Sequence, residues 1–298
     1  VGVVLSSEAE RKVWTVMEMV RWTEGYLRDK GFESPRLNGE LLLAGTLGVK
    51  RLDLYLQFDR PLSPEELAEF KSRLRRRAKR EPLQYIEGEA AFRDLRLRVD
   101  PRVLIPRSET ELLVDEVLAR ARGREGLHAL DVGTGSGAIA LSLATEGPFA
   151  RVVATDVSAD ALEGARANLA AAAPGAPVEF RQGSVYAPVA GETFDVVVSN
   201  PPYIGEGERD SLDAGVRDWE PAAALFSGEG GVDVVPELVA GPPRVLRPGG
   251  LLAMEIGWRQ ADAVSELVRA VEGFSEPVVR QDLEGRDRIV TAEYGTRE

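Results

Sequence analysis

An α/β domain with a mostly parallel, doubly wound sheet is predicted for the second part of this 298-residue chain, and a helical domain for the first part. Three observations predict this architecture. From about Leu104 onward, short apolar runs alternate with helix-like stretches. A glycine-rich loop follows the first of these runs and opens the next helix. Before residue 88, apolar residues instead recur at helical spacing.

The first part of the chain, from residue 7 to about 88, is predicted to be helical. Its apolar side chains recur every three or four positions, as at Val13, Val16, Met17 and Val20. The segment Ser63-Pro64-Glu65-Glu66 has the pattern of a capping box with proline at the first helical position. It predicts a helix that begins there and continues through Leu74.

The segment Lys71–Arg80 is the strongest run of charge in the chain, with seven basic residues in ten. Its simplest interpretation is the solvated face of the helix that begins near Ser63. The alternative is a contact surface for an acidic or RNA-containing partner.

The second part of the chain has the pattern of a seven-stranded sheet. Alternating residues from Phe92 to Val103 first predict a pair of strands that links the two domains. Predicted strands of the sheet are Ala129–Val132, Val152–Asp156, Val178–Arg181, Phe194–Ser199, Gly250–Ile256, Val278–Asp282 and Arg288–Glu293. Predicted helices are Ala138–Thr145, Ala159–Ala173, Val232–Leu246 and Ala261–Val271. We therefore expect a helical domain at 1–88, a β-hairpin linker at 89–103 and an α/β domain at 104–298.

The composition excludes several kinds of chemistry. With 0 Cys and 1 His, the chain has no thiolate nucleophile and no cysteine- or histidine-rich metal site, so we expect no metal. No motif surrounds His128, which we interpret as a strand residue with satisfied hydrogen bonds. No run of about 18 apolar residues predicts a membrane span, and the apolar segment 1–5 is too short for a signal peptide. We expect a monomer in the cytoplasm.

The charge is unevenly distributed. Residues 1–100 carry 19 Lys and Arg against 17 Asp and Glu, whereas the remaining 198 carry 18 against 32. An acidic second half repels a phosphate backbone over most of its surface, and this weighs against direct binding of nucleic acid.

The glycine-rich loop, Gly133-Thr134-Gly135-Ser136-Gly137, predicts a ligand site. Glycine permits tight turns and lets the backbone approach a ligand closely. Asp156, at the end of the next strand, can accept hydrogen bonds from both hydroxyls of a ribose. The loop alone leaves open S-adenosylmethionine, a dinucleotide or a turn without a ligand. Asp131 favours S-adenosylmethionine, because it can hold an ammonium group but would repel a pyrophosphate.

The tetrapeptide Asn200-Pro201-Pro202-Tyr203 is predicted to carry the chemistry. It follows a buried-type strand, at the carboxyl end where ligands of such sheets bind. An amide nitrogen is a poor nucleophile because its lone pair is delocalised, so it needs acceptors on its N–H groups that aim the lone pair. The Asn200 side-chain oxygen and the Pro201 carbonyl can accept these bonds, and Tyr203 can stack on the planar group. The alternative is a proline-rich turn of purely structural role.

Several segments resemble the HemK/PrmC family of protein-glutamine N5-methyltransferases, over nearly the whole chain. The segments are Glu81-Pro82-Leu83-Gln84-Tyr85-Ile86, Leu104-Ile105-Pro106-Arg107 with Glu109-Thr110-Glu111, Asn200-Pro201-Pro202-Tyr203-Ile204, Glu220-Pro221, and Glu255-Ile256-Gly257 with Gln260. The Asn-Pro-Pro-Tyr tetrapeptide is shared with adenine and other amino-methyltransferases, whereas the segment at Leu104 is more specific.

The resemblance implies a Rossmann-like class I methyltransferase domain that uses S-adenosylmethionine and releases S-adenosylhomocysteine. The implied substrate is the glutamine of the Gly-Gly-Gln tripeptide in class-1 peptide chain release factors, which the helical domain helps to recognise. The implied cofactor residues are Asp131, Gly133, Thr134, Gly135, Ser136, Gly137, Asp156, Ser184, Val185 and Asn200, with Pro106, Arg107 and Thr110 walling the pocket. Ser184 stands where the family usually has an acidic residue beside the adenine. The implied catalytic residues are Asn200, Pro201, Pro202 and Tyr203.

Other functions stay open at this point. One is methylation of a ribosomal-protein glutamine, and another is N6-methylation of adenine in nucleic acid, which the acidic second half disfavours. A dinucleotide oxidoreductase is opposed by Asp131 and by the tetrapeptide. A non-catalytic ribosome-binding module would leave the pocket residues unexplained.

Overall fold

The computed structural model describes residues 13–295. The chain divides into two compact units, Val1–Glu87 and Gly88–Glu298, and each is described by itself. The helix expected over residues 7–12 lies outside the described residues. Within the described part, every helix is too short or too polar to span a bilayer.

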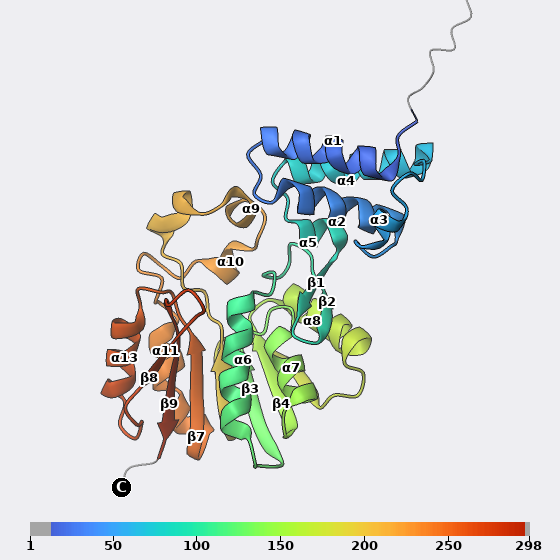
Figure 1. The fold of residues 1–298 in the computed structure, drawn as a ribbon. Coiled ribbons are helices and arrows are strands. Elements are labelled where there is room, and N and C mark those ends of the chain that lie inside the picture. The colour runs from blue at the N-terminus through green and yellow to red at the C-terminus, as the bar shows by residue number, and fades with distance from the viewer. Residues whose placement is uncertain (1–12, 296–298) are drawn as a thin grey trace, which may run out of the picture. The chain divides into compact units, whose positions relative to one another are not determined.

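The first unit consists of helices packed around one apolar core (Figure 1). They are α1 (Val16–Asp29), α2 (Pro35–Leu47), α3 (Asp53–Leu56), α4 (Pro64–Ala78) and α5 (Leu83–Glu87). Ser63 caps α4 as predicted, because its hydroxyl accepts from the Glu66 N–H at 3.2 Å while the Glu66 carboxylate accepts from the Ser63 N–H at 2.9 Å. Phe70 and Leu74 of α4 are buried in the core.

The basic run Lys71–Arg80 mostly binds groups of its own unit. Arg73 pairs with Glu87 at 2.9 Å, and Arg76 pairs with Glu81 at 2.6 Å. Arg77 and Arg80 lie over the ring of Phe32, at 4.6 and 4.1 Å from its centroid. These four arginines therefore help to hold the helices together, while Lys71, Arg75 and Lys79 of the same run are exposed.

The second unit begins with the hairpin of β1 (Glu89–Phe92) and β2 (Leu95–Arg98). The strand pair starts earlier than the predicted Phe92, which ends the first strand instead of opening it. Both strands lie within the hairpin expected at 89–103. The alternation of apolar residues is interrupted at Arg93-Asp94, which form the turn, and Arg93 adopts a positive φ of 51° there. Leu95 and Leu97 of the hairpin pack into the core of the α/β unit.

The predicted seven-stranded, mostly parallel sheet is confirmed, in the order β5-β4-β3-β6-β7-β9-β8. Its strands are β3 (Leu127–Val132), β4 (Phe149–Asp156), β5 (Val178–Gln182), β6 (Phe194–Ser199), β7 (Leu246–Glu255), β8 (Val278–Gln281) and β9 (Asp287–Tyr294). Strands β5 through β7 run parallel, whereas β9 is antiparallel to both β7 and β8. The chain leaves β3 toward β4 on one side and returns to β6 on the other, so a topological switch point lies between β3 and β6.

Helices cover both faces of this sheet (Figure 1). They are α6 (Ser108–Ala121), α7 (Ala138–Glu146), α8 (Ala159–Ala172), α11 (Val235–Ala240), α12 (Pro242–Val245) and α13 (Ala261–Ala270), with the short η1 (Ala187–Val189), η2 (Glu206–Ser211), α9 (Ala214–Arg217) and α10 (Ala222–Leu225) in loops. Val196 and Val198 join a core with α6 and α7, while Val197 joins a second core with α11 and α13. This alternation of side chains along β6 explains its continuous apolar sequence.

Two helices differ from the prediction. The stretch Val232–Leu246 was predicted as one helix, but it is divided into α11 and α12 at Gly241-Pro242-Pro243, because proline lacks the N–H that would continue the helix. Helix α6 was not among the predicted helices. It begins directly after the segment Leu104–Arg107 and buries Leu113, Val114 and Val117.

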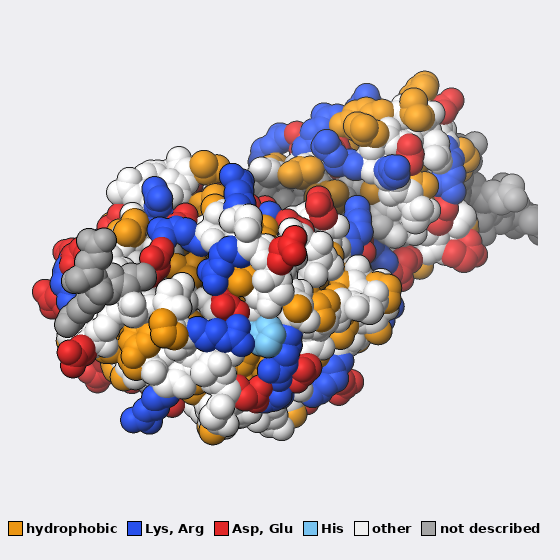
Figure 2. Space-filling view, turned by 90° about the horizontal axis from the view of Figure 1, so that it is seen from below, with side chains coloured by type: hydrophobic (Ala, Val, Ile, Leu, Met, Phe, Trp, Pro, Cys, Tyr) orange, Lys and Arg blue, Asp and Glu red, His pale blue; other side chains and the backbone are white. Residues whose placement is uncertain are grey.

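His128 is a strand residue with hydrogen-bond partners, as expected. The backbone N–H of His128 donates to the Asp195 carboxylate at 2.9 Å, and its ring Nδ1 lies 3.2 Å from Arg247. Figure 2 shows this single histidine on the surface beside arginine side chains. Arg247 and Arg124 both pair with Asp195, at 2.5 and 3.3 Å. The cluster of His128, Asp195 and the two arginines therefore connects neighbouring elements of the fold.

Candidate active site

A cavity of about 280 Å³ lies at the carboxyl ends of β3, β4 and β6, beside the topological switch point. Its wall includes the predicted residues Pro106, Arg107, Thr110, Gly133, Thr134, Gly135, Ser136, Asp156, Ser184, Val185, Asn200, Pro201 and Pro202. The predicted residues Asp131, Gly137 and Tyr203 are not part of the wall. The structure thus brings the glycine loop, the segment at Leu104 and the tetrapeptide together around one space.

The glycine loop presents its backbone to this cavity. Gly133 and Gly135 have φ values of 76° and 54°, and a Cβ built on either would meet no atom within 4 Å. The positive φ therefore requires glycine here, and the open side leaves room for a ligand against the backbone. Gly137 differs, because its Cβ would lie 3.3 Å from the Cβ of Ala165. Its role is close packing of α7 against α8.

Asp131 lies beneath the glycine loop and is completely buried. Its Oδ2 accepts from the Thr134 hydroxyl at 2.6 Å and from the Ala140 N–H at 3.2 Å, which fixes the loop to the start of α7. Its Oδ1 is buried without a hydrogen-bond partner among residues 13–295. Burial, to which the nearby charge of Asp156 adds, raises the pKa of Asp131 to about 7. The predicted contact of Asp131 with a ligand stays a prediction.

Asp156, at the end of β4, is oriented by the loops on either side of it. Its Oδ2 accepts from the Gly135 N–H and its Oδ1 from the Ser158 N–H, both at 2.9 Å. A carboxylate oxygen can accept more than one hydrogen bond, so both oxygens keep acceptor capacity for a ligand in the cavity.

Ser184 and Val185 form the side of the cavity that follows β5. Val185 has a φ of 41° and is buried in the core that contains α11 and α13. Apolar walls beside it come from Leu238 of α11 and Ala224 of α10, which the sequence did not indicate. A flat apolar group fits this side, and the contact predicted between Ser184 and an adenine stays a prediction.

The tetrapeptide leaves β6 at the cavity wall. The Asn200 Nδ2 donates to the Thr110 hydroxyl at 3.0 Å, and this hydroxyl donates to Glu255 Oε2 at 2.7 Å. The Asn200 Oδ1 has no hydrogen-bond partner among residues 13–295. Asn200 therefore keeps its side-chain acceptor, Oδ1, available, while its side-chain donor, Nδ2, is already bound to Thr110.

Tyr203, which is not part of the cavity wall, is held in place by a hydrogen bond to its backbone. Its carbonyl accepts from the Gln260 Nε2 at 2.9 Å. Burial, together with the nearby charge of Glu255, raises the pKa of the Tyr203 hydroxyl above its usual range, so the phenol stays neutral at physiological pH. The predicted stacking of its ring on a substrate amide stays a prediction.

Glu220 connects two segments of the cavity wall through an ion pair and a hydrogen bond. It is buried, its Oε1 pairs with Arg107 at 2.5 Å, and its Oε2 accepts from the Ile105 N–H at 3.1 Å. Arg107 and Pro221, on the two connected segments, both line the cavity. Glu220-Pro221 is one of the segments that resemble the HemK/PrmC family, but no role could be predicted for it from the sequence.

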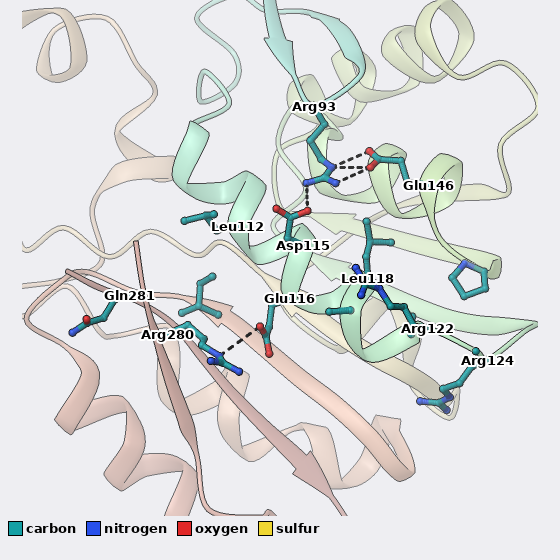
Figure 3. A pocket seen from close by; sticks show the side chains of 15 residues that line it. Arg93, Leu112, Asp115, Glu116, Leu118, Arg122, Arg124, Glu146, Arg280 and Gln281 are labelled. Carbon is teal, nitrogen blue, oxygen red and sulfur yellow. Dashed lines mark hydrogen bonds and ion pairs between the residues drawn. The ribbon is translucent and has the colours of Figure 1, made fainter. Parts of the chain in front are cut away.

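A larger hollow, of about 1060 Å³, lies between α6 and β8 (Figure 3). Several of its charged side chains are paired: Arg93 with Glu146 and Asp115, both at 2.8 Å, and Arg280 with Glu116 at 3.7 Å. It shares no residue with the first cavity. Because this larger hollow contains neither sequence motif, the smaller cavity is the candidate active site.

A glycine loop at the switch point, an aspartate ending the next strand, and an antiparallel β9 inserted beside β7 define a class I S-adenosylmethionine-dependent methyltransferase fold. Comparison with known families agrees: residues 108–247 match the family described as methyltransferase small domain, and residues 18–88 match the PrmC N-terminal domain. A solved methyltransferase from Pyrococcus furiosus shares this fold, with a TM-score of 0.51 and 22% identity over 69% of this chain and 91% of that chain.

The particular family follows from close relatives. The release factor glutamine methyltransferase of Geobacter sulfurreducens is 43% identical over 95% of this chain and 98% of its own length. The protein of the same name from Chlorobaculum tepidum is 42% identical over 94% and 97%. The chain belongs to the release factor glutamine methyltransferase family, which confirms the resemblance seen in the sequence.

Proposed function

We propose that this chain transfers a methyl group from S-adenosylmethionine to the side-chain N5 of the glutamine in the Gly-Gly-Gln motif of class-1 release factors. The observation that carries the proposal is the Asn200 Oδ1, an unengaged acceptor on the cavity wall whose Nδ2 is bound to Thr110. The relatives carry the name of the same activity and match this chain over nearly its whole length.

The residues of the cavity fit S-adenosylmethionine. Gly133 and Gly135 leave open space against their backbone, and Asp156 keeps acceptor capacity for a ribose diol. The apolar side formed by Val185 and Leu238 suits an adenine. When bound, the cofactor supplies an electrophilic methyl group on a sulfonium.

The role of the chain is to hold and orient the substrate amide. The Asn200 Oδ1 and the Pro201 carbonyl accept from its two N–H protons, which raises electron density on the nitrogen and aims its lone pair. Positioning of this kind can supply much of the rate enhancement for a reaction with a strong electrophile. A strong general base is not required, because the proton can leave the nitrogen after the transfer.

We also propose the roles of the parts of the chain. Residues 1–88 recognise the release factor, residues 89–103 form the linker and residues 104–298 carry the reaction. The acidic charge of the second half disfavours nucleic acid as the substrate. The protein acts as a monomer in the cytoplasm, where its protein substrate is found.

Replacing Asp156 with alanine is expected to weaken binding of S-adenosylmethionine about 10²-fold, since hydrogen bonds to a charged group contribute about 1.5–3 kcal/mol each. Calorimetry measures this directly. Asp160→Ala is the matched control, because Asp160 is an exposed aspartate four residues further along. Equal affinity of the Asp156 variant and the wild type would refute the ribose assignment.

The test of the function is a methylation assay with labelled S-adenosylmethionine, a purified release factor, ribosomal proteins and DNA. Label is expected on the release factor, and it should disappear when the glutamine of the Gly-Gly-Gln motif is replaced by alanine. Label on ribosomal protein alone, or on DNA alone, would replace the proposal with one of the other two substrates.

A further inference from the structure

Glu255 is an acidic residue that directly follows the buried apolar residues Leu251–Met254 at the end of β7. It is 1% exposed and ends β7, directly beside the strand that leads into Asn200. The parallel register pairs Ser199 of β6 with Met254 of β7, so Asn200 and Glu255 follow at neighbouring positions. A carboxyl group is rarely buried in such a place without a specific partner.

That partner is the Thr110 hydroxyl, which connects Glu255 to Asn200. A hydroxyl has one proton to donate, and Thr110 donates it to Glu255 Oε2 at 2.7 Å. Its lone pairs are then the groups that face Asn200, and they can only accept. The Asn200 amide must therefore present Nδ2 to Thr110, as it does at 3.0 Å, and turn Oδ1 to the other side.

The direction of the hydrogen bonds from Asn200 to Thr110 and from Thr110 to Glu255 decides which atom of the Asn200 amide faces the cavity. If Thr110 donated to Asn200 instead, the amide would turn over, and Nδ2 would face the substrate. A donor there would meet the donor N–H groups of a glutamine amide and could not orient them. The acceptor at Glu255 prevents this, because it takes the only proton of the Thr110 hydroxyl.

A second residue after β7 holds the backbone of the same tetrapeptide. The Gln260 Oε1 accepts from the Gly257 N–H at 2.8 Å, which fixes the amide of Gln260. Its Nε2 then donates to the Tyr203 carbonyl at 2.9 Å. The segment Glu255–Gln260 thus reaches the tetrapeptide twice, through Thr110 at the first side chain and directly at the last carbonyl.

We propose that Glu255 and Thr110 are positioning residues that set the orientation of the Asn200 amide, so that Oδ1 and not Nδ2 faces the substrate nitrogen. The inference rests on the proposed function, because it assigns these residues a role in holding the glutamine amide. It gives Thr110 a task beyond walling the cofactor pocket, and it gives the Glu255-Ile256-Gly257 segment a role.

The test compares steady-state kinetics of Thr110 variants. Thr110→Val keeps the volume but removes the hydroxyl, and its kcat is expected to fall about 10²-fold, the size typical of a misplaced reacting group. Its affinity for S-adenosylmethionine should stay within a few-fold of wild type. Thr110→Ser restores the hydroxyl and should recover most of the activity. Thr145→Val, which removes a hydroxyl on α7 away from the cavity, is the matched control with wild-type kcat.

Variants of Glu255 separate positioning from general packing. Glu255→Leu removes the acceptor and should lower kcat, whereas Glu255→Gln keeps an acceptor oxygen and should retain more activity. The double variant of Thr110→Val with Glu255→Leu should be no slower than Thr110→Val alone, because both changes interrupt the same series of hydrogen bonds. Multiplicative losses in the double variant, or wild-type kcat for Thr110→Val, would overturn the proposal.

A measurement without substrate distinguishes this inference from the proposed function. In a ¹⁵N-labelled sample, one Asn200 Nδ2 proton is expected to exchange slowly with water in the wild type and rapidly in Thr110→Val. Equal exchange in both proteins refutes the positioning role, whatever the substrate. Slow exchange in the wild type alone supports the role even if the release factor assay fails.

Discussion

Replacing Asn200 with alanine is expected to lower kcat about 10³-fold, or about 4 kcal/mol, while affinity for S-adenosylmethionine stays within a few-fold of wild type. The substitution removes the side-chain acceptor that faces the cavity and leaves the glycine loop and Asp156 in place. An amide nitrogen without this acceptor is neither aimed nor enriched in electron density. Single-turnover methylation and calorimetry measure the two quantities separately.

The control for this variant is Leu283→Ala, because Leu283 is 96% exposed in the turn between β8 and β9 and far from either motif in the sequence. It should have wild-type kcat. A large loss of cofactor affinity in Asn200→Ala, with little change in kcat for bound substrate, would assign Asn200 to cofactor binding instead of to the reaction.

Features of the fold that depend on neighbours in sequence were predictable. The glycine loop, the capping box at Ser63 and the apolar runs of the strands each carry their signal within a few residues. The errors lie where two local signals conflict. The apolar spacing across Val232–Leu246 is helical, but Gly241 and the prolines after it interrupt the hydrogen bonds.

Most of the predicted site residues line one cavity, but the contacts among them were not predictable from the sequence. Thr110 lies 145 positions from Glu255 and 90 from Asn200, and Arg107 lies 113 positions from Glu220. No spacing in a single sequence reports contacts at such separations, because they arise only when the strands assemble. A usable signal was present in β7, where one glutamate follows the apolar residues Leu251–Met254.

The basic run shows the same limit for charge. In the sequence, Lys71–Arg80 was interpreted as a solvated face or as a partner surface. In the structure Arg73 and Arg76 are paired with glutamates that lie further along the chain. Sequence shows how many charges a segment carries, whereas their availability depends on the carboxylates that the fold brings to them.

The folded protein without cofactor is expected to lose stability as the pH rises from about 5 to about 8. Two buried carboxyls cause this: burial raises the pKa of Asp131 from 3.8 to about 7 and that of Glu255 from 4.5 to about 7. Between these values the folded state binds more protons than the unfolded chain, so the free energy of unfolding falls with rising pH. The stabilising contribution is complete below the unfolded pKa and is lost as the pH passes the folded pKa.

Carboxyls with lowered pKa act in the opposite direction, but at lower pH. Hydrogen bonds from Arg151 hold the pKa of Glu179 at about 2, and Arg102 similarly lowers the pKa of Asp100. These groups gain stability from ionisation below about pH 5, and above it they are charged in both the folded and the unfolded state. They therefore contribute little to the slope in the window where Asp131 and Glu255 titrate.

Urea unfolding at several pH values between 5 and 8 measures the effect. Each buried carboxyl contributes a slope of up to about 1.4 kcal/mol per pH unit, and on the order of 3 kcal/mol between pH 5 and 8. Asp131→Asn and Glu255→Gln should each flatten the decline, whatever they do to stability at one pH, while Glu179→Gln should leave the slope unchanged. Stability that does not fall across this window in the wild type would mean that both carboxyls are already ionised in the folded state, and the Thr110 hydroxyl would then face a charged acceptor at every pH above 5.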